Sequence, residues 1–174
     1  MKLKAVYLLV ISITLFSPAV LWAEDLNTLK QEAVQTTKAF VKQLGGAMKK
    51  EMKAGGPVAA VKVCSELAPT ITANISRETG WQVTRVGTRV RNPMLGIADP
   101  WQQKVLAQFQ ARKDKGDSLE KMAHAEIVEE PDGKYFRFMK AIGVKSQCLA
   151  CHGDPATMKQ DVKDLLAKRY PHDL

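Results

Sequence analysis

The chain has 174 residues, and its 26 Lys and Arg against 18 Asp and Glu give a formal net charge of +8 at pH 7. Such a length suits one domain with one hydrophobic core. The basic residues are scattered between acidic ones, which argues against nucleic acid as a partner. The densest basic cluster, Lys49, Lys50 and Lys53, is typical of a solvated helix end. A docking patch for an acidic redox partner or a membrane surface is the alternative.

Residues 1–23 have the pattern of a secretory signal peptide. Lys2 and Lys4 precede an almost wholly apolar run, Ala5 to Phe16, and Ala23 is a small residue at the expected cleavage point. An uncleaved N-terminal anchor is the alternative, although the apolar run is short for a membrane span. In either case we expect residues 24–174 to form a single domain outside the cytoplasm, in the periplasm or an equivalent compartment.

Two helices are expected in the first half of this domain. Apolar residues recur every three to four positions over residues 25–53, which predicts a long helix with a candidate kink at Gly45-Gly46. Gly55-Gly56-Pro57 ends that helix, and its proline is well placed to open a second one. Cys64 lies on the apolar stripe of the second helix, which Pro69 should kink or divide.

The second half mixes strands and helices. Trp81–Val90 is rich in Val, Thr and Trp and is predicted to be a strand. Asp99-Pro100 should cap and open a helix. Residues 119–130 and 134–142 should pair as an antiparallel hairpin around the turn sequence Pro131-Asp132-Gly133, and Asp154-Pro155 should open a last helix. This order predicts an α+β fold with an antiparallel sheet.

The stretch Cys148-Leu149-Ala150-Cys151-His152-Gly153 reads C-x-x-C-H, the attachment signature of c-type haem. Two thiols at this spacing can add to the two vinyl groups of one porphyrin, and the histidine that follows is then held beneath the iron. A zinc site would need a second Cys or His pair at zinc spacing, and a thioredoxin-like motif would need a βαβ context. The sequence therefore predicts one covalent haem c, attached through Cys148 and Cys151, with His152 as the proximal iron ligand.

Cys64 is the only cysteine that the haem motif does not use. It is either a buried small apolar side chain or a second, thiolate ligand of the iron, and the residues alone leave both open. Other candidates for the sixth position are His124 and His172. Four methionines also offer a thioether, although methionine on an apolar face usually fills the core; they are Met94, Met122, Met139 and Met158.

Three arginines are candidates for binding the carboxylates of the haem propionates, because a guanidinium group forks onto a carboxylate. They are Arg85, Arg89 and Arg91. The alternative is an exposed, charged strand face. A catalytic constellation is not visible: the sequence has no G-x-S-x-G, no H-E-x-x-H and no phosphate-binding loop. We therefore do not expect an enzyme.

The chain resembles a known family, the PAS-like c-type haem domain. The family includes free exported cytochromes, one of them cyanobacterial, and sensor regions of some membrane histidine kinases. The matching residues are Ala60 to Cys64 with Ala68-Pro69, Arg85, Arg91-Asn92-Pro93, Trp101, the haem motif and Tyr170-Pro171. The resemblance implies a PAS-like antiparallel sheet flanked by helices, with haem held between sheet and helix. It also implies that Cys64 binds the iron opposite the histidine.

The chain departs from that family in two places. Met94 and Leu95 follow Arg-Asn-Pro where the family tends to show a further asparagine. The family also tends to continue past Tyr-Pro into a Gly-rich turn and a further strand. We therefore expect a sheet that is one or two strands short, or a sequence that is a fragment.

Two functions fit these observations. The first is a one-electron carrier that exchanges electrons with a periplasmic or membrane redox partner. The second is a sensor, in which redox state or a small gas changes the sixth iron ligand and a signalling partner detects the change. An enzyme such as a peroxidase ranks last, because it needs an open distal site with acid–base groups.

Overall fold

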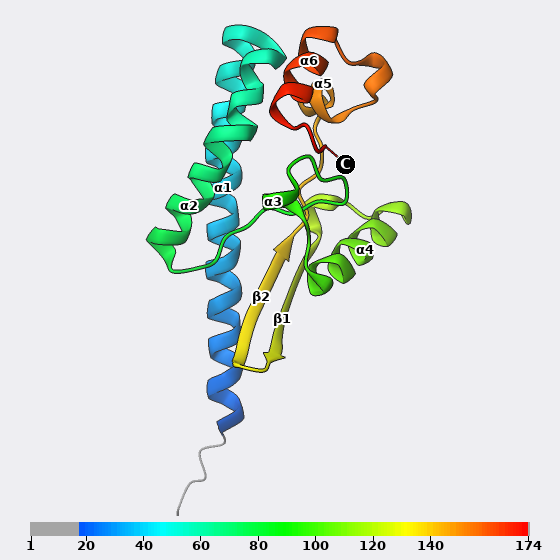
Figure 1. The fold of residues 1–174 in the computed structure, drawn as a ribbon. Coiled ribbons are helices and arrows are strands. Elements are labelled where there is room, and N and C mark those ends of the chain that lie inside the picture. The colour runs from blue at the N-terminus through cyan, green and yellow to red at the C-terminus, as the bar shows by residue number, and fades with distance from the viewer. Residues whose placement is uncertain (1–17, 174) are drawn as a thin grey trace, which may run out of the picture.

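The structure is a computed structural model that describes residues 18–173, with side chains from residue 25 onward. The predicted signal peptide therefore lies largely outside the described residues. The fold is α+β, as predicted: it is mostly helical with one antiparallel hairpin (Figure 1). None of the described helices carries an apolar stretch long enough to cross a membrane.

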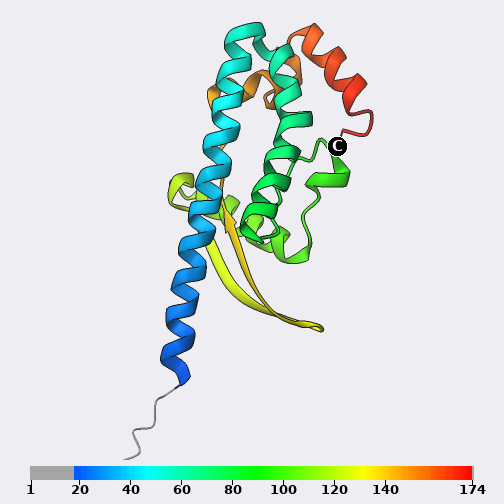
Figure 2. The ribbon, with the colours of Figure 1, turned by 90° about the vertical axis from the view of Figure 1, so that its left-hand side faces the viewer.

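The long N-terminal helix α1 spans Pro18–Lys62 and is broken at Gly55-Gly56. Gly56 has φ 67°, a left-handed value that glycine adopts without strain, and Pro57 begins the next helical turn. The chain reverses direction at this break, so that two antiparallel helical arms lie side by side (Figure 2). The predicted boundary is confirmed, whereas the expected kink at Gly45-Gly46 is absent because the helix continues through both glycines.

The returning arm contains one turn of π-helix. This arm begins at Pro57 with the last part of α1, continues through the π-helical turn η1 (Val63–Leu67) and ends with α2 (Ala68–Thr79). Pro69 has no backbone N–H, so the ordinary i→i−4 ladder is interrupted before it. The Ala68 N–H instead bonds to the Val63 carbonyl, five residues back. The predicted disturbance is confirmed, and it takes the form of a widened turn that contains Cys64.

The two arms are held together by apolar stripes. Phe40 and Leu44, one turn apart on the first arm, pack against Ile71 and Ile75 of α2. Phe40 and Ile75 are almost fully buried. These contacts align the first arm with the returning arm and set which residues face each other further along.

The predicted strand Trp81–Val90 is wrong. The segment has no regular secondary structure and joins no sheet in the described part of the chain. Its amides find other partners: the Val83 N–H donates to Ser76 Oγ (3.0 Å) and the Gly87 N–H to the Gly96 carbonyl (3.3 Å). Trp81 packs edge-on against Phe136, with ring centroids 5.7 Å apart. The strand-like composition therefore reflects side-chain packing and not a ladder of backbone hydrogen bonds.

The sheet of the described residues is a two-stranded antiparallel hairpin, β1 (Ala123–Glu130) with β2 (Gly133–Lys140). The register pairs Glu130 with Gly133 across a two-residue turn, as the Pro-Asp-Gly sequence predicts. The predicted first strand was too long, because Leu119–Lys121 forms a 3₁₀ turn. The second strand ends at Lys140, two residues before the predicted end.

Helices flank this hairpin, in agreement with the PAS-like expectation. β2 lies along the lower half of α1, and α4 (Pro100–Asp114) packs on the other side (Figure 1). The core under α4 is formed by Val105, Phe109 and Met122, and Met122 is fully buried. Asp99 caps α4 in a reciprocal capping box, as its sequence predicts.

Three short helices complete the structure. They are α3 (Pro93–Gly96), α5 (Leu149–His152) and α6 (Gln160–Arg169). The first two were not predicted. Asp154 does cap a turn, but that turn is a 3₁₀ segment, Pro155–Thr157, and the last helix begins only at Gln160. Both α5 and α6 lie beside the upper end of the two helical arms (Figure 1).

Candidate functional site: the C-x-x-C-H loop and the thiol that faces it

The C-x-x-C-H motif, predicted from the sequence to attach haem, occupies a 3₁₀ turn, Ser146–Cys148, that runs directly into α5. The turn ends at Gly153, whose N–H donates to the Leu149 carbonyl at 2.9 Å. A Cβ at position 153 would lie 2.4 Å from that carbonyl oxygen, so only glycine fits this close approach. The glycine thereby holds Cys148, Cys151 and the adjacent histidine on one compact turn.

Packing then places the motif against the helical arms. Cys151 packs on a cluster formed by Val61 of α1 and by Val162 and Leu166 of α6. Val61 lies one turn before Cys64 on the same arm. The cluster therefore brings the C-x-x-C-H loop next to the π-helical turn that carries Cys64.

Cys64 is half-buried, and its Sγ–H donates to the Met48 Sδ at 3.8 Å. Met48 comes one turn after Leu44 on the apolar stripe of the first arm, so the same register that packs the arms together sets this contact. Burial raises the pKa of the Cys64 thiol. The nearby Arg85 and Arg91 guanidinium groups oppose that shift, whereas the neighbouring Cys148 adds to it.

The described residues contain three free thiols, each of them half-buried: Cys64, Cys148 and Cys151. Burial also raises the pKa of Cys151, and the nearby Cys64 contributes. The three thiols are therefore close enough to influence one another, although they come from chain segments more than 80 residues apart. The structure brings Cys64, one of the candidates for distal ligation, close to the two cysteines that the sequence predicts to attach haem.

His152 is exposed overall but has protein on several sides. Partial burial, followed by the nearby Arg91 and Arg85 cations, lowers the pKa of its imidazole below the ordinary value. A lowered pKa keeps the ring neutral, and neutral imidazole is the form that binds iron.

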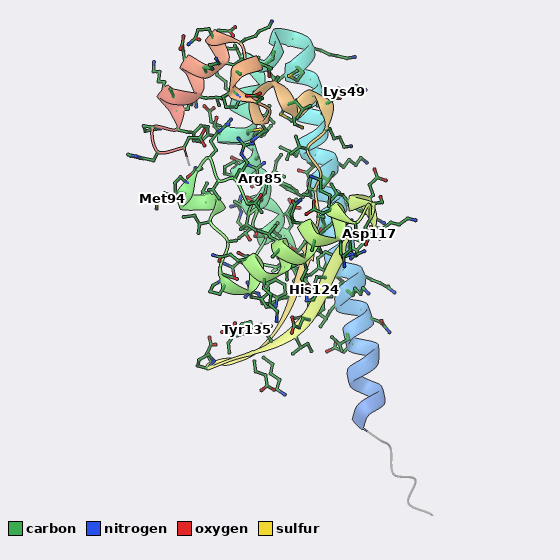
Figure 3. All side chains as sticks on the ribbon, turned by 90° about the vertical axis from the view of Figure 1, so that its right-hand side faces the viewer. Lys49, Arg85, Met94, Asp117, His124 and Tyr135 are labelled. Carbon is green, nitrogen blue, oxygen red and sulfur yellow. The ribbon has the colours of Figure 1, made fainter. Side chains whose placement is uncertain are left out.

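The predicted arginines behave differently from one another. Arg91 is mostly covered, with 20% of its side chain exposed, and its Nε donates to the Asp173 carboxylate at 2.8 Å. Arg85 is exposed and lies on the segment between the helical arms and α3 (Figure 3). Both interact electrostatically with Cys64 and His152, so two cations border the candidate site.

The C-terminal end of α6 closes the site, which the sequence did not predict. Arg169 pairs with Glu66 of the π-helical turn, and Tyr170 packs on the cluster that includes Cys151. Asp173, just beyond the helix, forms the ion pair with Arg91. The matching Tyr-Pro motif was the only sequence signal for this region, and it gave no partner for either arginine.

The other predicted ligands lie elsewhere. His124 is on the hairpin, where its Nε2 lies 3.2 Å from Glu126 and its ring packs against Trp101 (Figure 3). Met122 and Met139 belong to the core under α4. Met94 projects from α3 into solvent with 89% of its surface exposed, and His172 lies in an exposed C-terminal turn.

Met158 is the exception among the predicted methionines. It packs on the same cluster as Cys151, beside the C-x-x-C-H loop.

An open groove lies far from this site, between the lower part of α1 and the end of α2, where Thr79 and Trp81 line it. That groove contains none of the predicted ligands and plays no part in the site.

The donor set fits one haem c. Two thiols have the spacing needed for the vinyl groups, a neutral histidine follows them, and a third thiol comes from another helix. Leu149, between the two motif cysteines, and Leu67, one turn after Cys64, remain 53% and 41% exposed, and exposed apolar side chains of this kind suit contact with an apolar group. Within the described residues there is no cluster of three or more His, Cys, Asp or Glu suited to a bare metal ion.

Fold and site together define an α+β protein built on a long helical hairpin. The C-x-x-C-H loop packs near the end of this hairpin where the arms join at Gly55-Gly56, called the closed end below. The chain belongs to the Tll0287-like family, whose model matches residues 23–173. This confirms the resemblance drawn from the sequence.

A solved structure, described as the cyanobacterial heme-protein Tll0287, matches with a TM-score of 0.58 and 20% identity. The match covers 86% of this chain and 83% of the other, and it shows that the fold is shared. A comparison with curated proteins found no similar sequence.

Proposed function

We propose that the protein is an exported c-type cytochrome with one covalent haem, which transfers single electrons through an iron bound by His152 and Cys64. The observation that carries the proposal is the convergence of Cys64 on the attachment loop, although it lies on a different helix more than 80 residues away. Membership of a family that includes a structurally similar haem protein supports the same conclusion.

In this proposal each residue has a defined task. Cys148 and Cys151 form the thioether links, and the turn closed by Gly153 presents His152 to the iron. Cys64 supplies a thiolate on the opposite side. The haem itself supplies the reversible one-electron chemistry.

The charges around the site suit this role. Arg85 and Arg91 would offset the negative charge of the Cys64 thiolate and of the haem propionates. An anionic, electron-rich thiolate stabilises ferric over ferrous iron, so we expect a low reduction potential. We expect periplasmic location, a protein redox partner at the haem edge, no binding of nucleic acid and no enzymatic activity.

Two measurements test the proposal. Protein made together with its haem-attachment machinery should contain one haem per chain, resistant to acid–acetone extraction, and Cys148→Ala with Cys151→Ala should remove it. Cys64→Ala should retain the haem, lose the thiolate features of the ferric optical and EPR spectra, and have a higher potential. Unchanged spectra in Cys64→Ala, or a change caused by His124→Ala instead, would show that the ligand assignment is wrong.

A sensor that signals to a partner protein is the second candidate. The observation that favours it is the location of Cys64 on a π-helical turn, a feature often found at functional sites in helices. Exposure of the ferrous protein to CO or NO separates the two candidates. Rapid ligand binding supports sensing, and an inert six-coordinate iron supports electron transfer.

A further inference from the structure

A second sulfur lies within reach of the predicted distal position. The Met48 thioether is 3.8 Å from the Cys64 sulfur, and both side chains are half-buried. The four methionines considered from the sequence lie elsewhere: Met122 and Met139 in the core under α4, Met94 exposed on α3, and Met158 on the cluster beside Cys151. Met48 did not stand out in the sequence, because a methionine on the apolar stripe of a helix usually fills the core.

The fold holds Met48 in this place. Phe40, Leu44 and Met48 follow one another at intervals of four residues on the first arm, and the first two pack against Ile71 and Ile75. Met48 continues that stripe toward the closed end of the helical hairpin and contacts Cys64 of the returning arm. Lys49, the next residue, projects away from the hairpin (Figure 3).

The two sulfurs favour opposite oxidation states of iron. A thiolate is anionic and stabilises ferric iron, whereas a neutral thioether is a soft ligand that stabilises ferrous iron and raises the potential. Methionine has three rotatable side-chain bonds and adapts to small displacements. A small side-chain movement would therefore exchange one sulfur for the other at a single coordination position.

We propose that Met48 replaces Cys64 as the distal iron ligand when the haem is reduced. This inference rests on the proposed function. One electron, delivered by the redox partner, converts ferric to ferrous iron. The iron–Cys64 bond breaks with its electron pair remaining on sulfur, which takes one proton from water. A lone pair of Met48 Sδ forms the new bond to iron, so the exchange consumes one electron and one proton.

Proton NMR of the reduced, haem-loaded protein tests the exchange. A methionine bound to low-spin ferrous haem gives a three-proton methyl signal, shifted far upfield by the porphyrin ring current. We expect this signal in the wild-type ferrous protein and its loss in Met48→Leu. The ferrous Met48→Leu protein should also bind CO faster than wild type, because no thioether then occupies the sixth position.

Two matched controls are available. Met52→Leu removes a half-buried thioether one turn further along the same helix, and Met158→Leu removes the thioether beside Cys151. Both should retain the upfield methyl signal. Loss of the signal in either control, or its persistence in Met48→Leu, would overturn the proposal. Absence of the signal from the wild-type ferrous protein would do so without any variant, even if Met48→Leu failed to fold.

The ferric protein separates this inference from the proposed function. If ferric wild-type protein shows thiolate features that Cys64→Ala removes, His152 and Cys64 ligation stands whatever the ferrous NMR shows. If those ferric features are absent from the wild-type protein, the ligand assignment fails first.

Discussion

The two ends of the helical hairpin are built in different ways. Around the β-hairpin, polar groups pair with one another: Trp101 donates to Glu126 at 2.9 Å, Arg137 lies 4.3 Å above the Trp101 ring, and Lys140 donates to several backbone carbonyls. At the closed end, sulfur atoms and a histidine converge while two leucines beside them stay exposed. In the first region polar groups satisfy one another, whereas the second gathers the donor atoms that the proposed haem would need.

The largest change in the free energy of unfolding is expected from a substitution in the core beneath the β-hairpin. Met122→Ala removes a side chain that is 0% exposed, so we expect a loss of about 2–5 kcal/mol in the free energy of unfolding. Urea denaturation of the haem-free protein measures this. Met94→Ala, at a position that is 89% exposed, should change stability by no more than about 0.5 kcal/mol. Similar losses in both variants would contradict the assigned core.

A change at the closed end should affect the attachment loop before it affects global stability. Gly153→Ala forces a Cβ to within 2.4 Å of the Leu149 carbonyl oxygen, so the turn must open, at a cost of roughly 1–3 kcal/mol. We expect a sharp fall in the fraction of chains that acquire covalent haem, measured by haem absorbance per protein. Gly45→Ala has no heavy atom within 4 Å of its added Cβ and should stabilise the helix by roughly 0.5–1 kcal/mol. Normal haem content in Gly153→Ala would show that the close approach is not required.

The capping box near the hairpin predicts a pH dependence. Partial burial alone would raise the pKa of Asp99, but its hydrogen bond from the Gln102 N–H and its pairing with Arg137 outweigh this and lower the pKa. Because the folded pKa lies below the unfolded value of about 3.9, the carboxylate stabilises the fold above that pH, and the stabilisation is lost as pH falls through the folded pKa.

Asp99→Asn isolates the charge, because asparagine is also a good helix N-cap. We expect the variant to be less stable by up to about 1 kcal/mol at neutral pH, given the partial exposure of the Arg137 pair. The difference should disappear in strong acid. Urea denaturation at several pH values measures both, and a difference that grows on acidification would show that the sign is wrong.

The smallest effects should come from the ion pairs. Lys134 and Glu129 pair at 2.9 Å near the tip of the hairpin with 63% and 75% of their side chains exposed, so Lys134→Gln should leave the unfolding midpoint unchanged. Arg169→Gln removes the pair with Glu66 at the closed end and should cost up to about 1 kcal/mol, less in high salt. An equal effect of the two substitutions would show that the Arg169–Glu66 pair adds nothing to the docking of α6 on the helical arms.

Much of this architecture followed from local chemistry. Gly56 needs a positive φ, Asp99 caps a helix, Pro69 cannot donate a backbone hydrogen bond, and Pro-Asp-Gly forms a turn. Each of these effects depends on one residue and its near neighbours, so the sequence was sufficient to predict them. The spacing of the two motif cysteines is local in the same sense.

The wrong strand prediction and the ion pairs that were not predicted share a cause, which is contact between distant parts of the chain. Trp81–Val90 has the composition of a strand, but within residues 18–173 it pairs with no other strand, and pairing is a property of the whole fold. Asp173 as the partner of Arg91 and Arg169 as the partner of Glu66 join residues about 80 to 100 positions apart. No local pattern contains such a contact.

The sequence by itself determined that a C-x-x-C-H motif is present, that a third cysteine lies on an apolar helical stripe, and that glycine, proline and capping residues divide the helices. Only the tertiary structure decided that this third cysteine meets the motif and that Met48 lies 3.8 Å from it. The physical reason is the packing of the two helical arms. Their apolar stripes set the register between residues far apart in the chain, and that register brings the Met48 and Cys64 sulfur atoms into contact.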